Sequence, residues 1–310
     1  MTETDIQHCR HCRFSVAGFT FSVGIPSSVD ADRLLPSFRD FRCGGQALPE
    51  RDIFRMEQSP GTLRPDTGLR FIEETGTDIG LTCLYEAGQK YYLEIRHTDG
   101  SPVHQMLASK DFSRVEARID WTDRYAGNSL GSMLRIAYSQ AVLLHGAVSV
   151  HASVICLDGK AYLFAGKSGT GKSTHSALWL RHIPGSFLLN DDNPVIRLSD
   201  GIPTAFGTPW SGKTPCYRNE GFPVAGIARL SQAPENRFIP KHDVEAFSLL
   251  LTGCSFIRQD GYLLDALCGT LVETVQAVRC GILECRPDAQ AAVLCHKALT
   301  GIGEYNFENK

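Results

Sequence analysis

Long apolar runs are missing from this sequence, which excludes a membrane-spanning helix. No stretch approaches the roughly 18 apolar residues that a bilayer requires. The opening residues, MTETDIQHCRHCRF, are polar and contain no apolar core, so they do not form a secretory signal peptide. We therefore expect a cytoplasmic protein with no membrane partner.

An excess of charge of either sign is also lacking. The 31 Lys and Arg residues against 34 Asp and Glu residues leave a net charge of -3, so the basic footprint of a nucleic-acid-binding protein is absent. Repeats and low-complexity segments are absent too. A composition of 43% hydrophobic and 21% charged residues is that of a globular protein, and 310 residues suffice for two domains.

The cysteines give no sign of a disulfide framework. The sequence contains 11 of them, and an odd number argues against such a framework. Cys9 and Cys12 form a C-x-x-C motif beside His8 and His11, but a second ligand pair at zinc spacing is missing. We prefer a loose N-terminal tail to a metal site here.

Two regions differ in hydrophobic pattern. The pattern of residues 13–125 predicts mostly strands. Beyond them, strands alternate with helices, and the dipeptides Asp158-Gly159 and Asp200-Gly201 predict hairpins. We expect a β-rich N-terminal domain over 1–126 and an α/β domain over 127–310. The hairpins predict a mixed sheet in the second domain.

The segment GKSGTGKS at 166–173 completes the pattern G-x-x-x-x-G-K-[ST] between an expected strand and helix. Its glycines let backbone N–H groups turn toward phosphate oxygens, and the positive end of the helix adds to this field. Lys172 should face solvent in the absence of ligand and reach the β- and γ-phosphates of ATP, while the Ser173 hydroxyl should ligate Mg²⁺. Lys167 is interpreted as a solvated loop charge. The predicted nucleotide-binding residues are Gly166, Ser168, Gly169, Thr170, Gly171, Lys172, Ser173 and Thr174.

Two adjacent acids, Asp191 and Asp192, follow a short apolar run. A P-loop needs a carboxylate for Mg²⁺ at the end of a neighbouring buried strand. One acid should therefore serve the metal, and the other should accept the proton of an attacking hydroxyl. His151 is predicted to lie in the middle of a strand. The following hairpin leads the chain back to the strand before the loop, which would place His151 near the phosphates. The alternative is a hydrogen-bonded core histidine.

The segment HASVICLDGKAYLFAGKSGTGKSTHSALWL, with LLNDDNPVIRL, resembles the catalytic core of HPr kinase/phosphorylase. Phosphoenolpyruvate carboxykinase shares the hairpin that leads into the P-loop and the two adjacent Asp residues. The resemblance covers about residues 140–235 and implies a mixed-sheet P-loop kinase core. It also implies that His151, Lys172 and Asp191 are catalytic, with Asp191 as the base. Ser173 and Asp192 are then the metal-side residues.

This chain departs from that family in the segment GTPWSGKTPCYRNEGF, which has no acid before Glu220. The family has a further acidic metal ligand there, and its HPr-recognition segment is not evident. Lys213 and Arg218 either hold an acceptor or are surface charges. Arg229 and Arg237 are weaker candidates for stabilising charge in phosphoryl transfer.

These features predict an ATP-dependent kinase that phosphorylates a serine-like hydroxyl of a small molecule, peptide or protein. The partners expected are ATP, Mg²⁺ and this acceptor. The alternatives are an ATP-dependent phosphoenolpyruvate carboxykinase and a non-catalytic nucleotide-binding regulator. Whether the chain forms a homo-oligomer stays open.

Overall fold

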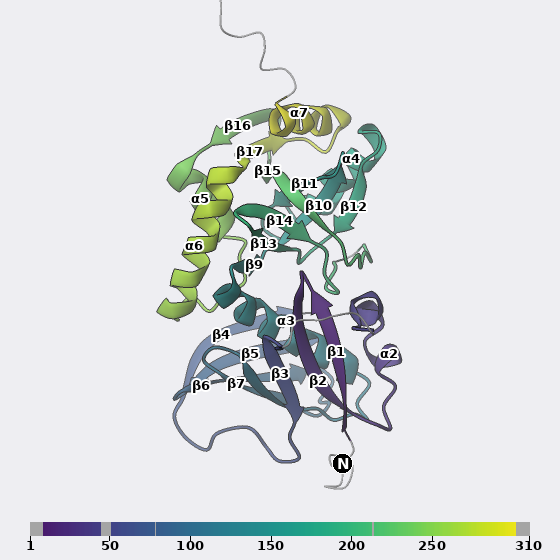
Figure 1. Cartoon of the computed structure of the whole chain (residues 1–310), viewed down its shortest axis with the longest axis vertical. Coiled ribbons are helices and arrows are strands. Elements are labelled where there is room, and N and C mark those ends of the chain that lie inside the picture. The colour runs from purple at the N-terminus through teal and green to yellow at the C-terminus, as the bar shows by residue number, and fades with distance from the viewer. Residues whose placement is uncertain (1–8, 45–50, 78, 213, 302–310) are drawn as a thin grey trace, which may run out of the picture. The chain divides into compact units, whose positions relative to one another are not determined.

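The computed structural model describes residues 9–44, 51–77, 79–212 and 214–301. The chain divides into two compact units, Met1–Leu144 and His145–Lys310. Each unit is built on one sheet that contains both parallel and antiparallel strand pairs (Figure 1). The expected mixed α/β class is therefore confirmed.

The first unit contains an eight-stranded sheet in the order β1-β2-β3-β8-β7-β6-β5-β4. Strand β3 pairs parallel with β2 and β8, and the remaining neighbours pair antiparallel. Its elements are β1 Cys9–Val16, β2 Phe19–Pro26, α2 Ala31–Leu34, the 3-10 helix η1 Pro36–Phe41, β3 Phe54–Gln58, β4 Leu69–Thr77, β5 Gly80–Ala87, β6 Lys90–His97, β7 His104–Ser109, β8 Arg114–Arg118 and α3 Ala126–Ala141.

Helix α3 belongs to the first unit, whereas the boundary expected from the sequence lay near its start. Its apolar face is buried, and Leu130, Met133 and Ala137 are fully covered. The Tyr138 hydroxyl donates a hydrogen bond of 2.9 Å to the Val16 carbonyl of β1. The helix is therefore part of the core beneath this sheet.

The motif Cys9-x-x-Cys12 lies in strand β1 rather than in a loose tail. Residues three apart on a strand point to opposite faces, and Cys12 is buried whereas Cys9 is half-buried. The two thiols are thus badly placed to share a metal ion. His8 lies outside the described residues.

The second unit contains a nine-stranded sheet whose main path is β12-β10-β11-β15-β14-β13-β9. Strand β15 pairs parallel with β11 and β17, and β16 pairs antiparallel with β17. The 3-10 helix η2 Val142–His145 contains the boundary between the units. The elements of the second unit are β9 Ala147–Ser149, β10 Ala152–Leu157, β11 Lys160–Ala165, α4 Lys172–His182, β12 Phe187–Asn190, β13 Val195–Ser199, β14 Ile202–Phe206, β15 Gly221–Gln232, β16 Arg237–Lys241, α5 Asp243–Leu251, α6 Gly261–Ala277, β17 Arg279–Cys285 and α7 Ala289–Thr300.

Both Asp-Gly hairpins form as predicted. Asp158 and Asp200 have φ angles of 49° and 52°, and each is followed by a glycine with positive φ. Two successive positive φ angles are the mark of a type I′ turn, which suits the twist of antiparallel strands. These turns join β10 to β11 and β13 to β14.

The prediction that His151 lies mid-strand is wrong. The chain changes partners at this point, because β9 pairs with β13 while β10 pairs with β11 and β12. His151 occupies the break between β9 and β10. Its side chain is therefore not held in the alternation of a strand.

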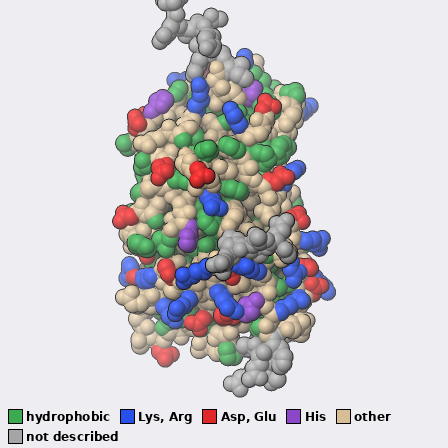
Figure 2. Space-filling view, viewed as in Figure 1, with side chains coloured by type: hydrophobic (Ala, Val, Ile, Leu, Met, Phe, Trp, Pro, Cys, Tyr) green, Lys and Arg blue, Asp and Glu red, His purple; other side chains and the backbone are tan. Residues whose placement is uncertain are grey.

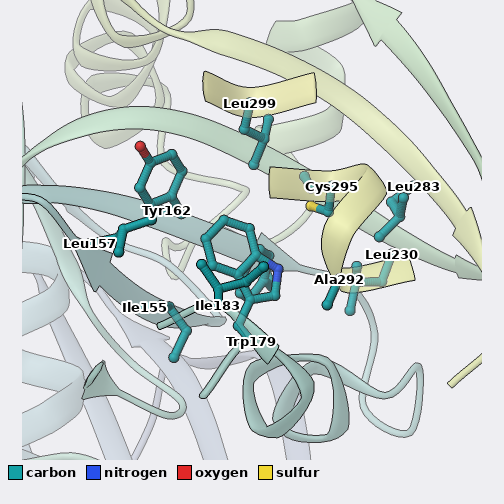
Figure 3. Packing of buried hydrophobic residues seen from close by; sticks show 12 residues of the cluster. Ile155, Leu157, Tyr162, Trp179, Ile183, Leu230, Leu283, Ala292, Cys295 and Leu299 are labelled. Atoms are coloured by element: carbon teal, nitrogen blue, oxygen red, sulfur yellow. The ribbon is translucent and has the colours of Figure 1, made fainter. Parts of the chain in front are cut away.

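A buried cluster between the sheet and helices α4 and α7 holds α4 in place (Figure 3). Trp179 of α4 is completely buried among Ile155, Ile183, Cys295 and Leu299. Burying an aromatic side chain of this size stabilises the fold by about 1.5–3 kcal/mol. The cluster thus fixes the helix that follows the glycine-rich loop.

On the face seen in Figure 2, basic and acidic side chains lie among one another, in keeping with the small net charge of -3. Within the described residues, no helix has both the length and the apolar character needed to cross a membrane.

Candidate functional site

The segment 166–173 lies between a strand and a helix, as expected: residues 166–171 form the loop after β11, and Lys172 and Ser173 begin α4. Gly166, Gly169 and Gly171 have φ angles of 152°, 83° and 99°, which L-residues rarely adopt. A Cβ atom on Gly166 would lie 2.5 Å from the Thr170 hydroxyl oxygen. Gly171 is the N-cap of α4, and no side chain caps this helix. The first backbone N–H groups of α4 are therefore available to an anion.

Lys172 is buried, with only 8% of its surface exposed, so the expectation that it faces solvent is wrong. The loop folds over its ammonium group, which donates to the carbonyls of Gly166 at 2.9 Å and Lys167 at 3.3 Å. It also lies 2.9 Å from His151 Nε2. Burial lowers the pKa of Lys172, and the charges of Asp192 and Asp191 oppose that shift.

His151 bridges Lys172 and Asp192. Its Nδ1 atom lies 2.9 Å from Asp192 Oδ1, and the two side chains are 37% and 30% exposed. An ammonium group only donates, so Nε2 accepts from Lys172 and Nδ1–H donates to Asp192. The pair is thus oriented by hydrogen bonds yet open to solvent, unlike a core histidine.

Asp191 has different partners from its neighbour. Its Oδ1 atom accepts from the Ser153 hydroxyl at 3.0 Å, and Ser153 in turn accepts from Ser176 at 2.6 Å. Its Oδ2 atom accepts from the Ser173 hydroxyl at 3.1 Å and from the Thr214 N–H at 3.3 Å. Asp191 is buried. The hydroxyl predicted to serve Mg²⁺ therefore contacts Asp191, not Asp192.

Asn190 fixes the backbone at Asp192 and Asn193, a role that the sequence did not reveal. Its carbonyl oxygen accepts from the backbone N–H groups of Asp192 and Asn193 at 3.0 Å each. Its amide donates to Thr208 and to the Trp210 carbonyl, both at 3.2 Å. The only signal was its place between a buried strand and two acids. Ser153 and Ser176 were missed because their pairing joins a strand to a helix.

A cavity of about 550 Å³ opens beside the loop and α4. The predicted nucleotide residues Gly169, Thr170, Gly171 and Thr174 line it, together with Leu178, Leu230, Ala233 and Pro287. His175 also faces it and accepts a hydrogen bond of 3.1 Å from Trp179 Nε1. Burial lowers the pKa of His175 to about 4, so its ring is neutral near pH 7.

A second cavity, of about 520 Å³, lies along the start of the loop. Lys167, Ser168, Arg229 and Ser231 line it, with Glu284. Lys167 thus borders a hollow rather than open solvent alone.

No protein-family model matches this chain, and no curated protein matches it in sequence. Among solved structures it is similar to the Hpr(Ser) kinase/phosphatase from Coxiella burnetii. The identity is 13%, over 49% of this chain and 88% of the other, and the TM-score is 0.31. The similarity is distant, covers half of the chain, and identifies neither reaction nor substrate.

The three arginines named from the sequence have other partners in the described structure. Arg218 lies 3.8 Å from Glu220 and over the ring of Phe187, and Arg237 pairs with Glu284 at 2.8 Å. Arg229 donates to the Thr252 hydroxyl at 2.6 Å. Lys213 lies outside the described residues.

A histidine–aspartate cluster also occurs in the first unit, where candidate ligand atoms of His97, His104 and Asp123 lie within 4.8 Å of one another. His104 Nδ1 accepts from the Asp120 N–H at 3.3 Å, so its Nε2–H donates to Asp123 at 2.7 Å. His97 contacts the Ile79 carbonyl and the Ser129 hydroxyl. Each ring nitrogen has a partner, and burial lowers the pKa of His104. The cluster is therefore explained as a hydrogen-bonded network.

Proposed function

We propose that this chain is an ATP-dependent kinase that transfers the γ-phosphoryl group to a hydroxyl. The observation that carries the proposal is the 2.9 Å contact between Lys172 Nζ and His151 Nε2. It joins the lysine of a phosphate-binding loop to a solvent-accessible histidine–aspartate pair. Phosphoryl transfer needs little beyond such positioning and charge stabilisation.

The nucleotide phosphates would lie on the loop and on the uncapped start of α4, with Lys172 turned toward them. The adjoining cavity, walled by Leu178, Leu230 and Pro287, suits an apolar base. A nucleobase has flat apolar faces and few polar edges, so it can be buried between such walls without leaving a buried charge unpaired.

Ser173 and Asp191 would hold Mg²⁺, since a hydroxyl and a carboxylate are the oxygen donors that this ion prefers. When bound, Mg²⁺ neutralises charge on the phosphates. This assignment gives Asp191 the role that the family resemblance implied for Asp192. Asp191 is buried, whereas the Asp192 side chain is 30% exposed, so Asp192 is the more accessible proton acceptor.

Asp192, oriented by His151, would take the proton. The acceptor O–H bond breaks, its oxygen bonds to the γ-phosphorus, and the bond from that phosphorus to ADP breaks. The proton moves to the Asp192 carboxylate, which already accepts from His151 Nδ1 and from the Asn193 amide at 2.5 Å. His151 Nδ1–H keeps the Asp192 carboxylate oriented while the proton is transferred.

The test uses γ-labelled ATP with pools of hydroxyl metabolites and peptides, and calorimetry with the Mg²⁺ complex of a non-hydrolysable ATP analogue. We expect binding and transfer, both lost in Lys172→Ala. The control is Lys160→Ala, an exposed lysine at the far end of β11. Because Lys172 is buried, thermal unfolding of each variant is measured alongside. Unchanged nucleotide affinity in a folded Lys172→Ala protein would refute the assignment.

Two other outcomes would name a different function. The His151–Asp192 pair could hold a second cation, which carboxykinase chemistry requires, so oxaloacetate is included as a substrate. Sustained phosphoenolpyruvate formation that depends on Lys172 would make the chain a carboxykinase. Tight nucleotide binding without transfer to any acceptor would make it a regulator.

A further inference from the structure

We propose that the cavity lined by Lys167, Arg229 and Ser231 binds an oxyanion carried by the acceptor. The acceptor is then a hydroxyl compound that bears a carboxylate or a phosphate group. This inference rests on the proposed kinase function and specifies its substrate class.

The two cavities beside the loop differ in chemistry although they share a border. Gly169, Thr170, Leu230 and Gln232 line both, and the Gln232 amide donates to the Gly169 carbonyl at 3.2 Å. The first has apolar walls that suit a base, and the arginine in its lining, Arg286, pairs with Asp288 at 3.1 Å. The second brings two cationic side chains together, which suits an anion instead.

The positive charges of Lys167 and Arg229 are not neutralised by other residues that line the second cavity. Over the described part of the chain, no carboxylate lies within ion-pair distance of Lys167 or Arg229. The Thr252 hydroxyl that Arg229 contacts is neutral. Glu284, the carboxylate in the lining, instead accepts from Arg237 at 3.1 and 2.8 Å. A guanidinium has five N–H donors, so Arg229 retains donors for an oxyanion.

The position of Arg229 links this cavity to the reacting groups. Arg229 is paired in register with Ala165, the last residue of the strand before the loop. The adjacent Thr252–Gly253 segment holds the backbone N–H of His151 through the Gly253 carbonyl, at 2.7 Å. An acceptor anchored at Arg229 would thus be tied to the strand ends that carry both the phosphate loop and His151.

The test separates this inference from the kinase function itself. The full chain is first saturated with the Mg²⁺ complex of the non-hydrolysable ATP analogue, which occupies the phosphate loop. It is then titrated calorimetrically with glycerol, glycerate and glycerol 3-phosphate, which differ in the charged group. We expect one or both anions to bind at least about tenfold more tightly than glycerol, the effect of one charge-assisted contact.

Arg229→Gln should remove that preference, and Arg229→Lys should restore part of it. The control Arg181→Gln changes an exposed arginine on α4 that lines neither cavity. Comparison of glycerate with glycerol 3-phosphate tells carboxylate from phosphate. If the analogue binds but neither anion exceeds glycerol, or if Arg229→Gln keeps the preference, the inference is overturned while the kinase function stands. If the analogue does not bind, both proposals fall together.

Discussion

Each unit of this protein contains a histidine–aspartate pair. The nitrogen–oxygen distances of the two pairs are similar, but their burial and their other hydrogen-bond partners differ. His104 and Asp123 are 2.7 Å apart with 0% and 4% of their side chains exposed. His151 and Asp192 are 2.9 Å apart with 37% and 30% exposed. In the first pair the other ring nitrogen accepts from the Asp120 backbone N–H, whereas in the second it accepts from the Lys172 ammonium group. Accessibility and the partner of the second nitrogen therefore separate the two pairs, and the proposed chemistry uses only the exposed one.

The largest effect expected from this contrast is on catalysis. Asp192→Asn should keep nucleotide binding and lose about 10²–10⁴ in the rate of phosphoryl transfer, because the proton acceptor is gone. Asp191→Asn should instead raise the Mg²⁺ concentration needed for half-maximal rate. Single-turnover rates across a Mg²⁺ titration measure both. The opposite pattern would return the base to Asp191, as the family resemblance implies.

A second effect concerns stability and should fall on the other pair. His104→Ala removes a buried ring and leaves Asp123 without that donor, which should cost about 3 kcal/mol of unfolding free energy. His151→Ala, at a half-exposed position, should cost about 1 kcal/mol or less. Denaturant unfolding of the two variants makes the comparison. Equal losses would show that the two pairs are not different in kind.

The smallest effect is expected from His175, a buried histidine that makes no carboxylate contact in the described structure. Its pKa of about 4 in the folded chain lies below the ordinary value of 6.5. The unfolded state therefore binds more protons between these values, so stability is complete above pH 6.5 and falls as the pH drops toward 4. Near pH 5.5 the loss should be about 1 kcal/mol.

His175→Gln should flatten that dependence, because glutamine can still accept from Trp179 Nε1 but does not titrate. Unfolding free energies at a series of pH values for wild type and variant provide the measurement. A variant that keeps the slope would assign the pH dependence to other groups.

Several features could be predicted because their causes are local. The Asp-Gly turns and the glycines of the loop depend on positive φ angles that few residues tolerate. Such preferences act within a few residues of chain, so a linear pattern records them.

Long-range pairing decided the rest. The roles of Asp191 and Asp192 depend on Ser153 and His151, which approach only when β10 pairs with β12. His151 lies at a break between strands because β9 pairs with β13, whereas β10 pairs with β11 and β12.

The sequence by itself determined the glycine-rich loop, the mixed α/β class and the two acids beside the loop, because each follows from backbone geometry or short spacing. Only the tertiary structure decided which acid meets Ser173 and which meets His151, and which residues of β15 and β17 border the loop. It also decided that α3 belongs to the first unit. Those choices depend on strand order and packing between distant segments, where many partners satisfy the same local pattern and only the assembled core selects one.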